Sequence, residues 1–162
     1  MRVTVTLSLA ACLAAGAAAA QSTAKPATGT PAIRACSLLT RDLATKYGTH
    51  NPKMLELFKP EEEAIGAHGS SCNDGGIFLQ VDPFVQSDNL RKSPAKDWQP
   101  VAGVGDTAFF HDNRGRYAEL IVWSGSHHFT LQINVPDGKT AESVKPHATG
   151  LAMALLAKLK AY

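Results

Sequence analysis

The stretch formed by residues 117–135 constrains the fold most strongly, because apolar residues alternate with other residues on both sides of Gly125 and Ser126. If these two residues form the loop of a β-hairpin, the apolar side chains of both strands meet on one face. A shift of one residue would move them to the other face, so the pattern predicts a single register. The expected opposed pairs are Trp123 with His128, Val122 with Phe129, Leu120 with Leu131, and Ala118 with Ile133.

Other strands are predicted ahead of this hairpin. Ile77, Leu79 and Val81 alternate with Phe78 and Gln80 after a strong turn at residues 73–76, and the segment around Cys72 is expected to pair with them. Residues 103–106 read as a tight turn that opens a strand over residues 107–111. Residues 87–100, which are polar and contain two prolines, are expected to form a loop with a helical turn.

Helices are predicted near both ends of the domain. Thr40 is a suitable N-cap for a short helix that ends at Gly48, and a last helix starts at Thr140 or Ser143. Pro146 favours the later start, because proline is tolerated in the first helical turn. Between them, helical spacing follows Pro52 and a second helical start is expected at residues 60–63. The order predicts an α+β domain, with helices packed on one face of an antiparallel sheet.

The first twenty residues have the pattern of a secretory signal peptide. A positive start at Arg2, an apolar run and a small-residue site ending at Ala20 predict cleavage before Gln21. Residues 21–32 then read as a disordered leader, and residues 33–162 as one domain in the periplasm or outside the cell. A second interpretation takes residues 9–12 as a lipobox with a lipid on Cys12. We rank it lower because it shortens the apolar run.

Removal of the signal peptide leaves two cysteines, Cys36 and Cys72. In an oxidising compartment they are expected to form a disulfide, because neither lies in a CxxC pair or beside a histidine ligand pattern. A catalytic or metal-binding thiol is the alternative. The net charge is +2 with scattered basic residues, which argues against a nucleic-acid partner. No other apolar stretch is long enough for a transmembrane helix in the mature chain.

No catalytic, metal or cofactor site is predicted. His127 and His128 are adjacent strand residues that point to opposite faces, so a metal site would need His128 together with His111 or Asp112. A nucleophile such as Ser124 lies in a hairpin rather than in the strand-to-helix elbow that serine hydrolases use.

The face of the hairpin opposite the core carries an unusual stripe, made of Tyr117, Ile121, Trp123 and His128. A solvated sheet would have polar residues there. A helix, such as one over residues 54–58, could cover the stripe, or the stripe could be a binding surface. We favour cover, since single domains often bury such patches.

Several of these features occur together in a known family. The run CSLLT at residues 36–40, a second cysteine at 72, the run GVGDTA at residues 103–108 and an alanine- and leucine-rich last helix resemble cell-envelope lipoproteins of unknown function typified in actinobacteria. Those proteins are similar in turn to sensor domains of bacterial Ser/Thr kinases and to PsbP-like folds. The resemblance covers about residues 35–159 and implies a fold and a disulfide. The early Cys12 and the long stretch 50–68 depart from it.

The sequence therefore predicts an exported cell-envelope protein of non-catalytic type that binds a protein or a small ligand. One alternative is a small secreted hydrolase or metal-dependent enzyme with a site near His111 and His128. Another is an inhibitor or immunity-type protein.

Overall fold

The computed structural model describes residues 33–50, 52–56, 59–65, 69–82 and 91–160. The predicted signal peptide, lipobox and leader lie outside these residues. Helices and strands follow one another as α1 (Ala35–Leu38), α2 (Arg41–Tyr47), α3 (Pro52–Leu55), β1 (Glu61–Ile65), β2 (Gly69–Asp74), β3 (Ile77–Val81), β4 (Gln99–Pro100), β5 (Thr107–Asn113), β6 (Tyr117–Ser124), β7 (His127–Asn134) and α5 (Ala141–Leu159).

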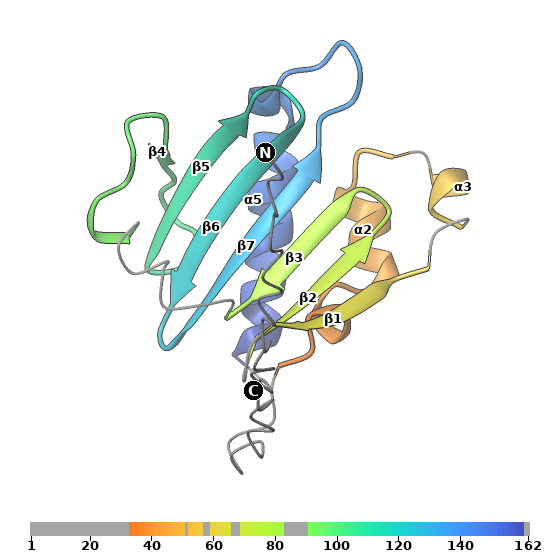
Figure 1. The fold of residues 1–162 in the computed structure, drawn as a ribbon, viewed down its shortest axis with the longest axis horizontal. Coiled ribbons are helices and arrows are strands. Elements are labelled where there is room, and N and C mark those ends of the chain that lie inside the picture. Colours follow the sequence, from red (N-terminus) through yellow and green to blue (C-terminus); the bar gives the residue numbers. More distant parts are fainter. Residues whose placement is uncertain (1–32, 51, 57–58, 66–68, 83–90, 161–162) are drawn as a thin grey trace, which may run out of the picture.

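The strands form one antiparallel sheet in the order β1-β2-β3-β7-β6-β5-β4. Figure 1 shows α5 crossing behind the centre of this sheet, with α1 and α2 on the same side. The helices contact β2, β3, β5, β6 and β7 from that side. The predicted α+β fold is confirmed, and among the described residues no helix covers the other face of the sheet. No helix in the described part of the chain is long and apolar enough to cross a bilayer.

The hairpin β6–β7 has the predicted register, with Trp123 opposite His128 and Leu120 opposite Leu131. Leu131 in turn lies opposite Leu79 of β3. These three leucines are fully buried, and they face Leu151 and Leu155 of α5, which belong to the same core. The core therefore lies between the sheet and α5.

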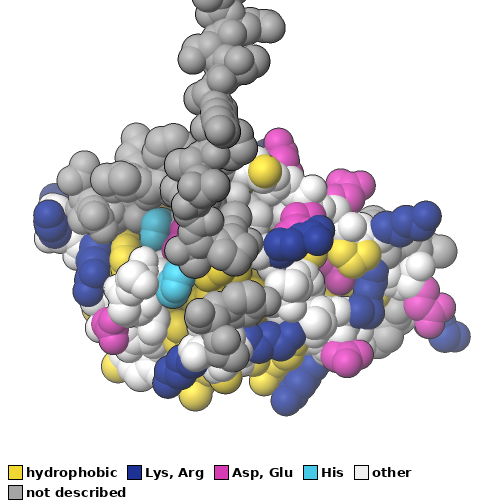
Figure 2. Space-filling model, turned by 90° about the horizontal axis from the view of Figure 1, so that it is seen from below, with side chains coloured by type: hydrophobic (Ala, Val, Ile, Leu, Met, Phe, Trp, Pro, Cys, Tyr) yellow, Lys and Arg dark blue, Asp and Glu magenta, His cyan; other side chains and the backbone are white. Residues whose placement is uncertain are grey.

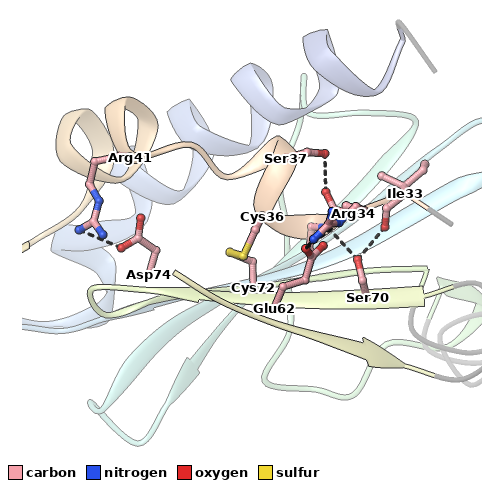
Figure 3. Close-up of a disulfide and its surroundings, with 10 residues drawn as sticks. Ile33, Arg34, Cys36, Ser37, Arg41, Glu62, Ser70, Cys72 and Asp74 are labelled. Atoms are coloured by element: carbon pink, nitrogen blue, oxygen red, sulfur yellow. Dashed lines mark hydrogen bonds and ion pairs between the residues drawn. A yellow bond between two sulfur atoms is a disulfide. The ribbon is translucent and has the colours of Figure 1, made fainter. Parts of the chain in front are cut away.

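The predicted disulfide is confirmed and joins α1 to the sheet. Cys36 of α1 is bonded to Cys72 of β2, with Cα atoms 4.9 Å apart (Figure 3). Beside it, the buried Ser70 hydroxyl donates to the Ile33 carbonyl (2.6 Å) and accepts from the Ala35 N–H (2.7 Å). These bonds and the disulfide hold the start of the domain on β2.

The predicted helix start at residues 60–63 is wrong, because Glu61 begins strand β1. Its backbone pairs with β2, which places Glu62 opposite Cys72 and makes β1 the edge strand of the sheet. Glu62 also forms a salt bridge with Arg34, in which Nη2 of Arg34 lies 2.6 Å from Oε2 of Glu62. The exposed acidic residues of β1 disfavour the pairing of another strand with this edge of the sheet. In the predicted loop 87–100, residues 87–90 lie outside the described residues and Gln99–Pro100 forms β4.

The later start of the last helix is also wrong, because α5 begins at Ala141. The hydroxyl of Thr140 caps it by accepting the Ser143 N–H at 3.3 Å. Pro146 therefore lies inside the helix, where it removes one backbone hydrogen bond. Pro146 is exposed, so water can bind the carbonyl that loses this bond, while burial of Ala141 and Val144 holds the first turn.

Candidate functional site

The face of the sheet away from the helices carries a straight row of side chains that crosses several strands. The pairings place Asn73 of β2 opposite Phe78 of β3, and Phe78 opposite Gln132 of β7. Gln132 lies opposite Glu119 of β6, and Glu61 of β1 lies opposite Asn73 at the other end. Neighbouring strands are about 4.8 Å apart, so these side chains follow one another at that spacing.

A groove of about 890 Å³ lies over this row, at the end of the sheet where β2 turns into β3. This volume falls in the range of small-molecule sites. We call it the open-face groove. The neutral side chains that line it are Asn73, Phe78, Tyr117, Gln132 and Asn134, and the charged or titratable ones are His50, Lys59 and Glu61.

Two of the neutral side chains are oriented by hydrogen bonds to residues outside the groove. Gln132 donates from Nε2 to Oε1 of Glu119 at 3.1 Å. Since a carboxylate only accepts, this bond fixes which end of the amide faces Glu119. The Tyr117 hydroxyl accepts from Nδ2 of Asn113 at 2.8 Å, which leaves its own proton to donate. Both side chains are thus positioned before any ligand binds.

The end of the groove at the β2–β3 turn depends on Gly76. This residue has a φ of 86°, and a Cβ there would overlap Nε2 of His50. Its carbonyl accepts the N–H of Asn134 at 2.9 Å, and the Asn134 carbonyl accepts the Thr49 hydroxyl at 2.8 Å. The glycine therefore lets the loop after α2 approach the sheet and close this end.

The residues of the predicted hairpin stripe lie in two places, the open-face groove and a second hydrophobic cluster. Tyr117 lines the groove, whereas Ile121 and Trp123 are 8% and 3% exposed and pack with Phe109. Among the described residues Trp98 covers this cluster, rather than the helix predicted at residues 54–58. Leu55 of that helix is instead buried next to the β2–β3 turn, and Phe58 lies outside the described residues. Trp123 is therefore largely buried and offers little surface to a partner.

The histidines of the alternative enzyme site do not converge. His111 is opposite Glu119, whereas His128 is opposite Trp123, four residues further along β6. This separates them by about 13 Å along the strands. The His111 ring stacks on Trp98 with centroids 4.9 Å apart, and its Nδ1 is 3.3 Å from Oδ2 of Asp97. Within the described ranges, no group of three or more histidine, cysteine or acidic residues is arranged to hold a metal ion.

His127 and His128 instead meet at Asp82, a residue that was not predicted from the sequence. The carboxylate of Asp82 contacts Nδ1 of His127 at 2.8 Å and accepts the His128 N–H at 2.9 Å. Asp82 has a φ of 46°, a conformation that few residues other than glycine adopt.

On the face seen in Figure 2, histidine side chains lie beside hydrophobic ones, while cationic side chains are interspersed with acidic ones.

A buried ion pair lies on the helix side of the sheet. The Asp74 side chain is fully buried, and its Oδ1 is 3.0 Å from Nη1 of Arg41 in α2 (Figure 3). Burial raises the pKa of the Asp74 carboxyl above its ordinary value, and the Arg41 guanidinium opposes this by lowering it. Arg41 also donates to the carbonyl of Leu55, so it links α2, α3 and the sheet.

Comparison of this chain with protein-family models, with curated proteins and with solved structures finds no match.

Proposed function

We propose that this protein is an exported, non-catalytic domain that binds a small ligand in the open-face groove. The observation that carries the proposal is the groove itself, which side chains from the five strands β1, β2, β3, β6 and β7 line on one face of the sheet. Polar groups in fixed positions beside an aromatic ring are the usual composition of a ligand site.

The neutral polar side chains of the lining are suited to binding rather than to proton transfer. Carboxamides and phenols donate and accept hydrogen bonds, but at neutral pH they do not take up or release protons. Asn73, Gln132 and Asn134 supply the amides, and Tyr117 supplies the phenol. These four side chains can orient and select a molecule without exchanging protons with it.

Export is supported by the first twenty residues and by the disulfide between Cys36 and Cys72. Disulfides persist in oxidising compartments such as the periplasm or the cell exterior. The likeness to cell-envelope lipoproteins is compatible with the same compartment and is part of the proposal.

A fragment screen on the isotope-labelled mature protein tests ligand binding. We expect small polar fragments to shift the backbone amide signals of Phe78, Tyr117 and Gln132 more than those of other residues. Gln132→Ala should weaken these responses, whereas Gln80→Ala should not, because Gln80 lies on the same face outside the groove. Fragments that bind only elsewhere, or that respond equally to both variants, would contradict the proposal.

A further inference from the structure

We propose that the ligand of the open-face groove is a neutral saccharide, bound as a short linear chain that lies across the strands. This inference rests on the proposed binding function and adds the chemical class of the ligand.

The polar groups of the groove match hydroxyl groups. A sugar hydroxyl both donates and accepts a hydrogen bond, and a carboxamide also offers one group of each kind. Because Nε2 of Gln132 is directed to Glu119, its Oε1 is the atom left to accept from a ligand. Tyr117 has the opposite role, since its oxygen accepts from Asn113 and its proton can be donated.

An aromatic ring lies at the centre of this polar row. Phe78 is half-buried, with Asn73 directly opposite on one neighbouring strand and Gln132 on the other. The C–H face of a pyranose is apolar and can pack on such a ring, while the hydroxyls of the sugar units on either side lie over the two amides. A flat ring flanked by amides therefore suits a sugar better than a wholly apolar ligand.

The spacing of the row suits a chain of sugars. Adjacent strands are about 4.8 Å apart, which is close to the length of one hexose unit. A linear oligosaccharide across β2, β3 and β7 would place successive units over Asn73, Phe78 and Gln132. One strand would then contribute to each subsite.

The charges of the groove favour a neutral ligand over an ionic one. Lys59 and Glu61 both line it and carry opposite charges, so neither sign dominates. An anionic ligand would need cationic forks such as arginine. A peptide is disfavoured for another reason: the backbone groups under the groove are paired within the sheet, whereas peptides commonly bind by adding a strand at a sheet edge.

The test is a titration of the isotope-labelled mature protein with cellotriose, maltotriose and chitotriose. We expect at least one of them to shift the amide signals of Asn73, Phe78 and Gln132. Gln132→Ala and Asn73→Ala should each weaken its binding about tenfold, the effect of losing one hydrogen bond in a site. Gln80→Ala is the matched control and should change the affinity less than about twofold. Phe78→Leu keeps an apolar side chain but removes the ring, and it should also weaken binding.

The outcomes separate this inference from the proposed function. If none of the three saccharides binds while polar fragments still bind in the groove, the saccharide inference is overturned and the binding function stands. If a short neutral peptide shifts the groove signals and the saccharides do not, the ligand is a peptide and the inference is also overturned. If neither saccharides nor fragments bind there, both proposals fail together.

Discussion

Asp74 is a carboxylate that the fold places out of contact with water. Its charge is balanced by Arg41, which is one-third exposed and therefore keeps part of its hydration. A charged group in such a place costs free energy even when it is paired. The charged side chain of Asp74 therefore lowers the free energy of unfolding at neutral pH.

Asp74→Asn removes this buried charge and leaves Arg41 one-third exposed to water, so we expect it to raise the free energy of unfolding slightly at pH 7. The raised pKa of Asp74 means that the folded state holds the proton more tightly than the unfolded state. The contribution of Asp74 to the free energy of unfolding is thus most favourable below the ordinary carboxyl pKa of about 3.9. This contribution is lost as the pH rises through the raised pKa of the folded state.

Urea denaturation of both proteins at pH 7 and near pH 3.5 measures this effect. The advantage of the variant should shrink at the lower pH, where Asp74 of the unaltered protein is also neutral. Arg41→Met is the control and should destabilise the protein at pH 7, because the buried charge then has no partner. If Asp74→Asn is less stable than the unaltered protein at pH 7, this account is refuted.

Trp123 is the second residue with a clear expectation. It is 3% exposed, and its ring meets that of Phe109 edge to face at 6.0 Å. Trp123→Ala should lower the free energy of unfolding by about 3 to 5 kcal/mol, because it leaves a cavity. Thermal melting measures the loss. Trp98→Ala, which removes a half-buried ring, should cost less, and a near-native melting temperature for Trp123→Ala would return this face to consideration as a binding surface.

At the scale of elements, the strength of the local pattern decides what could be predicted. The hairpin β6–β7 was predictable because both strands and their turn lie in one short stretch, and only one register buries Leu120 and Leu131 together. The strand β1 was not, because consecutive glutamates also suit a helix start. Only the pairing with β2, which supplies backbone hydrogen bonds, makes Glu61 to Glu63 a strand.

The disulfide determines how firmly α1 is attached to the sheet. The bond between Cys36 and Cys72 closes a loop across 36 positions of the chain. Cys36→Ala should lower the free energy of unfolding by about 3 to 4 kcal/mol, because the unfolded chain gains freedom. Denaturation with and without reductant measures this. The reductant should destabilise the unaltered protein and leave Cys36→Ala unchanged, whereas an equal effect on both would exclude the bond as its cause.

For the molecule as a whole, the open-face groove could not be predicted from the sequence beyond Tyr117. Its lining residues are separated by up to about half of the chain, and they meet because β3 lies beside β7. That neighbour relation has no local signal, since the two strands are far apart in sequence. The amides of Asn73 and Gln132 are also ordinary surface residues until the strand order brings them together.

The predicted export gives a test on the entire chain. Mass measurement of the protein recovered from the cell envelope or the medium should give a chain that begins at Gln21 without a lipid. Replacing Ala18 and Ala20 with larger residues should block this cleavage and leave the precursor. A diacylated species that begins at Cys12 would instead identify a lipoprotein.

The pairing of β3 with β7 also has a consequence for the order of folding. The hairpins β2–β3 and β6–β7 each close short loops, which takes little entropy, whereas joining them must close the long segment between Val81 and His127. Non-local strand pairing of this kind slows folding. The groove spans this junction, so it forms only in chains that have completed the slow step. A ligand would then bind only after the slow step. It would lower the rate of unfolding and would not raise the rate of folding.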